Sequence, residues 1–132
     1  MNAEHMAAIA GVGIDTADVA RIRKLLENYG EAFLEKTFTK DEVAYCSSKA
    51  DPAVHYAGRF AAKEAMAKAL GTGFSGEVSM KGVSVSNNEN GAPEAVLDEG
   101  AARRMKELGG AKILVSITHL KDHAQAVAII SR

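Results

Sequence analysis

The chain has 132 residues, 47% of them hydrophobic and 25% charged, which indicates a single soluble globular domain spanning residues 1–132. The formal net charge of −1 argues against a protein built mainly to bind nucleic acid, and no segment reaches the ~20 apolar residues that cross a bilayer, which argues against a membrane protein. Cys46 is the one cysteine, so an internal disulfide and a cysteine-rich zinc site are excluded and a cytoplasmic location is expected.

The first half of the chain predicts one strand followed by helices. Residues 7–14 are short, apolar and glycine-containing, as in a first strand. Residues 19–29 carry apolar side chains at helical spacing and precede a glycine that can end a helix. A short helix is expected over residues 32–36. Residues 39–47 open with the capping-box pattern T-x-x-E, and residues 52–70 begin with proline in the first turn, so each range predicts a further helix.

The second half predicts mostly strands. Residues 82–86 and 94–97 are two short strands joined by the polar turn NNENGAP. A helix is expected over residues 101–108, followed by strands at 112–118 and 124–130. Helices gathered early and strands gathered late predict an α+β fold, with a mainly antiparallel sheet packed against the helices.

The segment GVGID resembles the start of a dinucleotide-binding motif, but the third glycine of that motif would fall at Thr16. We therefore interpret Gly11 and Gly13 as a crowded strand end. Asp15 lies where the first strand passes into a helix. Its carboxylate either binds a ligand or caps the helix N-terminus, and these residues alone leave the two interpretations equal.

The segment AGRFAAKEAMAKALGTG presents charges on an alanine-rich helix. Glu64 and Lys68 are four residues apart and so share a face, where an exposed ion pair is the simplest interpretation. Phe60 lies one turn earlier on that face and instead indicates a sheltered patch. Arg59 and Lys63 lie on the adjacent strip, so we expect the bases of this helix to meet phosphates and its acid to hold a metal ion.

His119 ends the apolar run KILVSIT, and its simplest interpretation is a capping or surface histidine. It could also complete a metal site with Asp15 and Glu64. Two carboxylates without a cysteine favour a hard cation such as Mg²⁺, which takes one or two protein carboxylates together with phosphate oxygens. Cys46 is interpreted as a small buried residue.

Three motifs, GVGIDTADVARI, AGRFAAKEAMAKALGTG and VSITHLKDHAQAVAII, carry a resemblance to the holo-acyl-carrier-protein synthases, the short bacterial type of 4′-phosphopantetheinyl transferase. The likeness runs from about Ala8 onward. It implies transfer of the phosphopantetheine arm of coenzyme A to a serine of apo acyl carrier protein, with adenosine 3′,5′-bisphosphate released. It also implies the 4′-phosphopantetheinyl transferase fold, and a homotrimer with each active site at a subunit boundary.

The resemblance further assigns roles to individual residues. Asp15 and Glu64 would hold Mg²⁺, Lys68 would face the pyrophosphate, and these three form the implied catalytic set. Residues expected near the coenzyme A nucleotide are Arg59, His119, Lys49, Gly91 and Pro93. Glu64 could also accept the proton of the attacking serine.

The carrier protein would meet a separate surface. Acyl carrier proteins are acidic, so a basic helix would steer their approach. The resemblance implies a carrier-binding arginine at Arg21, with Leu25 and Phe33 as apolar contacts; the alternative for Arg21 is an ordinary solvated helix face. For the whole protein, the alternative function is a non-catalytic module that binds coenzyme A or a carrier protein.

Overall fold

The computed structural model describes residues 8–132, so Ala7, the expected start of the first strand, lies outside the described residues. The elements follow in the order β1 (Ile9–Asp18), α2 (Val19–Tyr29), α3 (Glu31–Thr37), α4 (Lys40–Ser47), α5 (Pro52–Leu70), β2 (Val83–Asn87), β3 (Pro93–Leu97), α6 (Glu99–Glu107), β4 (Lys112–His119) and β5 (His123–Ser131). The predicted α+β class is confirmed. No helix within residues 8–132 has both the length and the apolar character needed to cross a bilayer.

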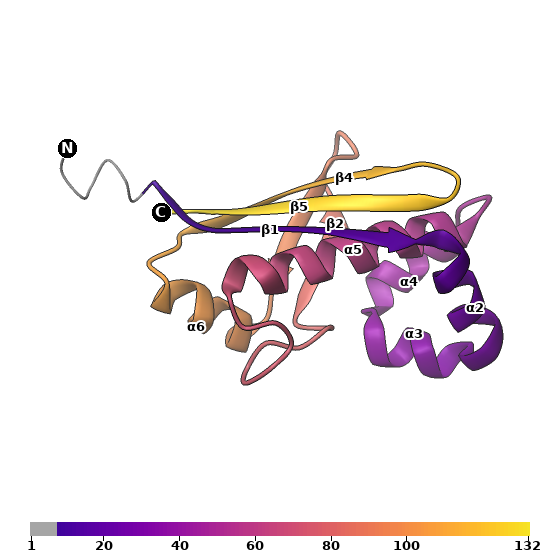
Figure 1. The fold of residues 1–132 in the computed structure, drawn as a ribbon, viewed down its shortest axis with the longest axis horizontal. Coiled ribbons are helices and arrows are strands. Elements are labelled where there is room, and N and C mark those ends of the chain that lie inside the picture. Colours follow the sequence, from indigo (N-terminus) through magenta and orange to yellow (C-terminus); the bar gives the residue numbers. More distant parts are fainter. Residues whose placement is uncertain (1–7) are drawn as a thin grey trace.

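Helix α5 is the centre of the fold, with β1, β5 and β4 along one side of it and the other helices near its two ends (Figure 1). It is buried around most of its circumference, which explains its composition. A side chain on Gly13 would collide with the backbone carbonyl of Ala65, and one on Gly11 with that of Ala69. The predicted crowding is therefore confirmed, because the two glycines let β1 lie directly against α5, but they lie within β1 and not at its end.

The strands form two antiparallel sheets. One has the order β1-β5-β4 and the other is the hairpin β2-β3. The first sheet packs one face on α5 and leaves the other face uncovered. Apolar side chains share that outer face, since Val12 pairs with Ile129 and Ile14 with Val127 in the strand register. Val12, Ile14 and Leu114 are 60%, 55% and 50% exposed, so this chain alone leaves an apolar sheet face in solvent.

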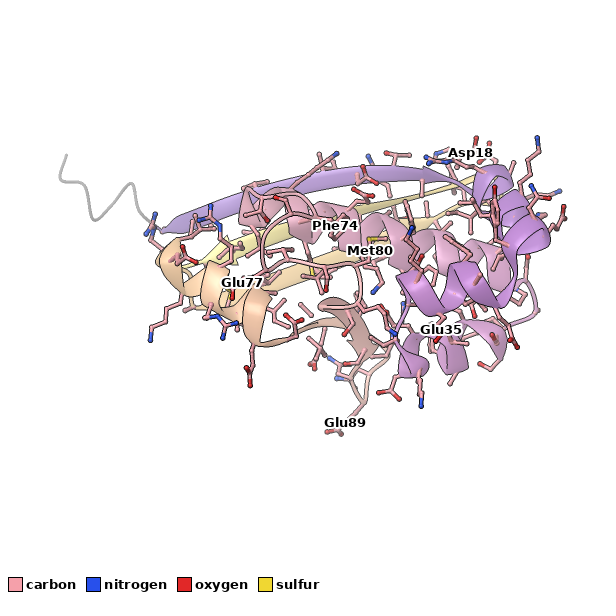
Figure 2. The ribbon with its side chains drawn as sticks, turned by 90° about the horizontal axis from the view of Figure 1, so that it is seen from below. Asp18, Glu35, Phe74, Glu77, Met80 and Glu89 are labelled. Carbon is pink, nitrogen blue, oxygen red and sulfur yellow. The ribbon has the colours of Figure 1, made fainter. Side chains whose placement is uncertain are left out.

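Strand β1 extends four residues beyond its predicted end. This extension decides which of two aspartates, Asp15 or Asp18, caps α2, which the sequence alone could not show. Asp18, at the junction of β1 and α2 (Figure 2), caps α2 by accepting a hydrogen bond from the backbone N–H of Ala20 at 2.9 Å. Asp15 lies within β1 and pairs in register with Ala126 of β5. The helix-cap interpretation of Asp15 is therefore wrong, and its carboxylate is left for other contacts.

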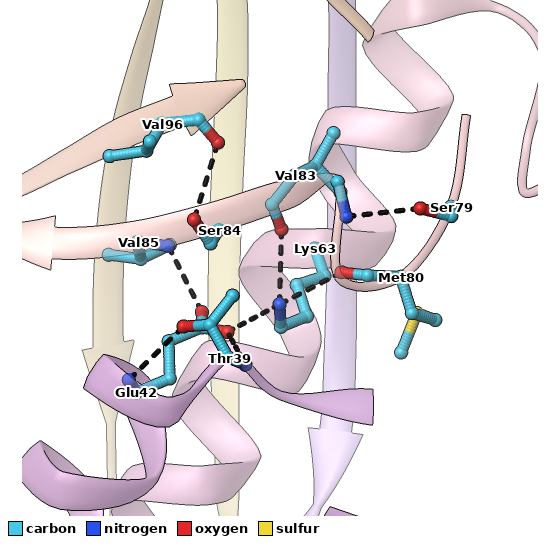
Figure 3. A network of polar contacts seen from close by, with 10 residues as sticks. Thr39, Glu42, Lys63, Ser79, Met80, Val83, Ser84, Val85 and Val96 are labelled. Atoms are coloured by element: carbon cyan, nitrogen blue, oxygen red, sulfur yellow. Dashed lines mark hydrogen bonds and ion pairs between the residues drawn. The ribbon is translucent and has the colours of Figure 1, made fainter. Parts of the chain in front are cut away.

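Lys63 corrects a second expectation, because it is an interior residue and not one of the exposed bases of α5. Its ammonium lies 2.6 Å from Glu42 Oε1, and both side chains have 0% exposure. It also donates to the carbonyls of Met80 at 2.9 Å and Val83 at 3.1 Å (Figure 3). Three acceptors use all three of its protons, so Lys63 joins α4, α5 and β2 and is unavailable to a phosphate.

The segment between α5 and β2, which carries Phe74, Glu77 and Met80 (Figure 2), is held against α6. Arg103 of α6 donates to both carboxylate oxygens of Glu77, with a shortest distance of 2.8 Å. Arg104 donates to the carbonyl of Leu70 at 2.9 Å. These contacts fix the C-terminal end of α5 independently of the Lys63 pair.

Candidate active site

A small pocket forms where β1, α2 and α5 meet. Asp15 from β1, Arg21 from α2, and Phe60 and Glu64 from α5 line a volume of about 200 Å³, together with the β1 residues that follow Asp15. We call this the carboxylate pocket. Phe60 and Glu64 lie on one face of α5, as predicted, and the aromatic ring gives the carboxylate a partly sheltered environment.

Lys68 lies one turn beyond Glu64 but turns toward β1. Its ammonium is 3.0 Å from Asp15 Oδ1 and donates to the carbonyl of Ile14, also at 3.0 Å. Within residues 8–132 the ion pairs include Lys68 with Asp15 but not Lys68 with Glu64, so the simple helix-surface pair is wrong. The structure therefore brings the three predicted catalytic residues together at the junction of β1 and α5.

The two carboxylates affect each other electrostatically. Burial raises the pKa of Glu64 and the nearby negative charge of Asp15 raises it further, while Lys68 and Arg21 act in the opposite direction. The carboxylate pocket thus disfavours the charged form of Glu64, and a cation between the carboxylates would relieve that cost. Within the described residues, 8–132, no group of three or more His, Cys, Asp and Glu side chains forms a metal cluster. The interpretation in which His119 joins Asp15 and Glu64 is therefore wrong.

His119 lies instead in a second pocket, on the opposite edge of the three-stranded sheet from β1. This pocket has a volume of about 110 Å³ and is formed by the N-terminal half of α5, the end of β4 and the β2-β3 turn. We call it the cation pocket. Its lining residues are Tyr45, His55, Gly58, Arg59, Asn87, Gly91, Pro93, Ile117 and His119. Four of the five residues expected at the nucleotide are among them.

Arg59 is the main charge of the cation pocket and is 5% exposed. Its guanidinium lies 4.0 Å from the ring centre of Tyr45, and its Nη2 donates to Asn87 Oδ1. Asn87 in turn donates to the carbonyl of Gly91 at 2.9 Å, which connects the arginine to the turn that carries Gly91 and Pro93. The Nε of Arg59 is buried without a hydrogen-bond partner, so a polar group of this pocket is unsatisfied.

Lys49, the fifth expected nucleotide residue, is not a lining residue of the cation pocket, but it borders it. Its ammonium lies 4.5 Å from the centre of the Tyr45 ring, which Arg59 also contacts. Gly58 allows a further close approach, because a Cβ there would lie 3.1 Å from Ile117 and 3.8 Å from the His119 ring. The end of β4 can therefore lie directly against α5.

Besides Gly58 and Ile117, the sequence did not single out three polar or aromatic residues that line the cation pocket: Tyr45, His55 and Asn87. His55 was detectable, since it lies four residues before Arg59 and so shares its helix face. Tyr45 and Asn87 carried no such signal, because α4 and the β2-β3 turn meet α5 only in the folded chain.

The expected carrier-binding residues occupy α2 and α3. Arg21 is exposed and lines the carboxylate pocket, whereas Leu25, four residues later on α2, is half-buried. Phe33 of α3 is also half-buried and lies edge-on to Phe38, with ring centres 5.8 Å apart. Arg21 therefore borders the carboxylate pocket from the exposed surface of α2.

Comparison with known proteins identifies the class. Residues 11–128 match the model of the 4′-phosphopantetheinyl transferase superfamily. The holo-acyl-carrier-protein synthase of Syntrophotalea carbinolica is 41% identical over 124 residues, covering 94% of this chain and 97% of the relative. The corresponding protein of Chlamydia trachomatis is 43% identical over 119 residues, covering 90% and 97%.

Solved structures give the same answer for the fold. The crystal structure of the synthase from Neisseria meningitidis superposes with a TM-score of 0.86 at 31% identity, over 94% of this chain and 99% of that one. The Helicobacter pylori synthase in complex with coenzyme A has a TM-score of 0.80 at 32% identity, over 91% and 99%. The chain belongs to the 4′-phosphopantetheinyl transferase superfamily, in its holo-acyl-carrier-protein synthase family.

Proposed function

We propose that this protein transfers 4′-phosphopantetheine from coenzyme A to a serine of apo acyl carrier protein. The serine oxygen forms a bond to the phosphorus bearing the pantetheine arm, and the pyrophosphate bond to the nucleotide breaks. Adenosine 3′,5′-bisphosphate leaves with that bonding pair. The observation that carries the proposal is the convergence of Asp15, Glu64 and Arg21 in one pocket, with Lys68 bound to Asp15 beside it.

Asp15 and Glu64 are the residues that would hold Mg²⁺. The donor set fits, since magnesium takes one or two protein carboxylates and completes its shell with water and phosphate oxygens. The raised pKa of Glu64, due to burial and to Asp15, also fits a pair that a divalent cation would stabilise. When bound, the ion supplies charge neutralisation to the pyrophosphate oxygens.

The residues around the pair have separate roles in the proposed reaction. Lys68 places a cation beside Asp15, where it can stabilise negative charge that develops on the pyrophosphate. Glu64 accepts the serine proton, a role suited to a carboxylate whose pKa lies above the usual range. Phosphoryl transfer of this kind depends on positioning and charge more than on covalent catalysis.

The cation pocket is the proposed nucleotide site. Arg59 and neighbouring Lys49 supply positive charge, His119 supplies an imidazole, and Gly91 and Pro93 supply the turn beside them. Pro93 also lines a larger groove of about 520 Å³ between β3 and β4. A nucleotide with a phosphate in the cation pocket therefore has an adjacent groove that can receive its nucleoside.

Two features support a homotrimer with shared sites. Arg59 and Glu64 are five residues apart, which places them ~140° apart around α5, and their pockets lie at opposite edges of the sheet. One coenzyme A reaches both kinds of pocket most directly if two copies contribute one each. A head-to-tail arrangement of this type closes into a ring, and the exposed apolar sheet face can supply the contact.

Arg21 is the proposed contact for the carrier. Its position at the mouth of the carboxylate pocket would bring an acidic partner to the place where its serine must react. Leu25 and Phe33 are half-buried on neighbouring helices and can add apolar contacts. The buried free thiol of Cys46 fits the reducing cytoplasm as the site of the reaction.

The decisive experiment mixes the protein with apo carrier, coenzyme A and Mg²⁺ and measures the carrier by mass spectrometry. The expected result is a mass increase of one phosphopantetheine group, lost when metal is omitted or when Glu64→Gln replaces the wild type. Glu107→Gln, an exposed position on α6, is the matched control and should retain activity. Binding of coenzyme A or carrier without a mass increase would instead identify the non-catalytic alternative.

A further inference from the structure

The cation pocket contains more positive charge than its neighbours balance. Arg59 and Lys49 both lie over the ring of Tyr45, and His55 and His119 complete the cluster. The one acid that acts on His55 is Asp51, whose two carboxylate oxygens each accept a hydrogen bond from Arg23 at 3.1 Å. Among residues 8–132, no Asp or Glu lines this pocket, so an anion that enters it has none of their carboxylates to displace.

His55 occupies the middle of this cluster. Its ring lies 5.0 Å from the His119 ring and 6.0 Å from the Tyr45 ring, edge-to-face in both cases. It is half-buried on α5, on the same face as Arg59. Burial lowers the pKa of His55, and the positive charges of His119, Lys49 and Arg59 lower it further, against a smaller opposite effect of Asp51. Without an anion, His55 is therefore neutral near physiological pH.

We propose that His55 is a further ligand-binding residue, which takes up a proton when the phosphomonoester of coenzyme A enters the cation pocket beside Arg59 and His119. This rests on the proposed function, which supplies the ligand. Coenzyme A carries one phosphomonoester, on its ribose, and its pyrophosphate belongs with the carboxylate pocket. The buried, unpartnered Nε of Arg59 is a donor that such a phosphate would satisfy.

The direction in which pH changes coenzyme A binding follows from the negative charge of the phosphate. Burial and then the neighbouring positive charges lower the pKa of His55, and a bound phosphate dianion opposes that lowering, so the pKa is higher in the complex than in the free protein. Between the pKa of His55 in the free protein and its pKa in the complex, binding takes up a proton, so the affinity for coenzyme A rises as pH falls. Since one unit of pKa displacement is a factor of about 10 in affinity, we expect coenzyme A to bind about three- to tenfold more tightly at about pH 6 than at about pH 7.5.

The test is isothermal titration of the full-length protein with coenzyme A in two buffers of different ionisation enthalpy, which gives the protons taken up on binding. Dephospho-coenzyme A, which lacks the phosphomonoester, is the matched ligand. His55→Gln removes the titrating ring, and His123→Gln makes the same change at an exposed histidine outside the pocket. The phosphate of free coenzyme A titrates near pH ~6 and is the same ligand for every variant, so differences in proton uptake between variants report the coupled titration of the phosphate with the residue that was changed.

The expected result is greater proton uptake for wild type and His123→Gln than for His55→Gln with coenzyme A, and no difference with dephospho-coenzyme A. His55→Lys, permanently charged, should bind coenzyme A with a flatter pH profile than wild type. Equal proton uptake by wild type and His55→Gln would overturn the role of His55, as would a difference that persists with dephospho-coenzyme A. In both cases holo-carrier formation would still stand. Failure of wild type to bind coenzyme A or to modify the carrier would overturn the proposed function itself.

Discussion

The ammonium of Lys63 lies 2.6 Å from the carboxylate of Glu42, and neither side chain is exposed. Glu42 also accepts hydrogen bonds from the backbone N–H groups of Thr39 and Val85, each at 3.0 Å, so one carboxylate caps α4 and pairs with β2 (Figure 3). The pair thereby fixes α5, and with it Glu64 and Arg59, relative to α4 and the hairpin. Because α5 supplies residues to both pockets, the pair is a structural centre for both.

Removing either partner should therefore destabilise the fold strongly. We expect Lys63→Met or Glu42→Gln to lower the free energy of unfolding by about 3–5 kcal/mol, because the remaining group is buried without its counter-charge. The double variant should cost less than the sum of the two. Urea unfolding followed by circular dichroism measures each value.

The exposed pair of Arg103 and Glu77 is the matched control, with a distance of 2.8 Å and more than half of each side chain in solvent. Arg103→Met should cost at most about 1 kcal/mol. A cost for Lys63→Met no larger than that of Arg103→Met would contradict the structural role of the buried pair.

Lys63 also shows a property that the sequence alone could not predict, namely how deeply a helix residue is buried. Helical spacing correctly placed it on a strip next to Arg59, but spacing gives the face of a helix and not its depth. Both sides of α5 are covered, by strands and by α4, and only the folded chain brings Glu42 to meet Lys63. The capping box at Thr39, by contrast, was predicted correctly because it is set by residues close in sequence.

The candidate site also has features that the sequence could predict and features that it could not. Asp15, Glu64 and Lys68 could be chosen from local patterns and a family resemblance, and the fold brings them together. That Asp18 and not Asp15 caps α2 depends on how far β1 continues along β5, which no local pattern shows. The same pairing of distant strands puts His119 across the sheet from Asp15.

Glu64→Gln should lose activity and gain stability. The pKa of Glu64 is raised in the folded protein, so its charge destabilises the fold above that pKa and costs nothing at acidic pH, where the carboxyl is protonated in both states. We expect the metal-free variant to melt a few degrees above wild type near neutral pH, with the difference vanishing in acid. Transfer activity should fall at least ~100-fold.

Thermal scans with and without Mg²⁺ provide the check. Added Mg²⁺ should raise the melting temperature of wild type and leave Glu64→Gln unchanged, since ligand binding stabilises only a protein that binds. Equal responses of the two proteins would argue against Glu64 as a metal ligand.

Cys46 should be inert in the native state. Burial raises the pKa of its thiol to about 12, with the positive charge of Arg59 acting in the opposite direction. Since the thiolate is the reactive form, a disulfide reagent at about pH 8 should react only as fast as the chain opens. Absorbance of the released chromophore measures this, and one thiol should appear at once in denaturant. Rapid labelling of the native protein would show that this part of the core is open.

The apolar outer face of the β1-β5-β4 sheet should determine assembly. Leu114→Lys places a charge on that face at a side chain that is already half exposed in the single chain, so the fold should survive and the proposed trimer should not form. Val96→Lys is the control, because Val96 is 48% exposed on β3, outside that face. Light scattering should give a monomer mass for Leu114→Lys, with activity reduced, as the proposed sharing of each site by two copies requires. A trimer unaffected by Leu114→Lys would place the interface elsewhere.

Arg21→Glu should weaken recognition of the carrier far more than recognition of coenzyme A. Arg21 lies on α2 at the mouth of the carboxylate pocket, where a positive charge attracts an acidic partner, and reversing it adds repulsion. We expect KM for the carrier to rise about tenfold or more, with KM for coenzyme A changed much less. Lys24→Glu, an exposed reversal on the same helix that does not line the pocket, should have a small effect.

Steady-state kinetics at two salt concentrations separate attraction from chemistry, because screening should reduce the difference between Arg21→Glu and wild type. Equal increases in both KM values would show that Arg21 serves the carboxylate pocket and not the carrier.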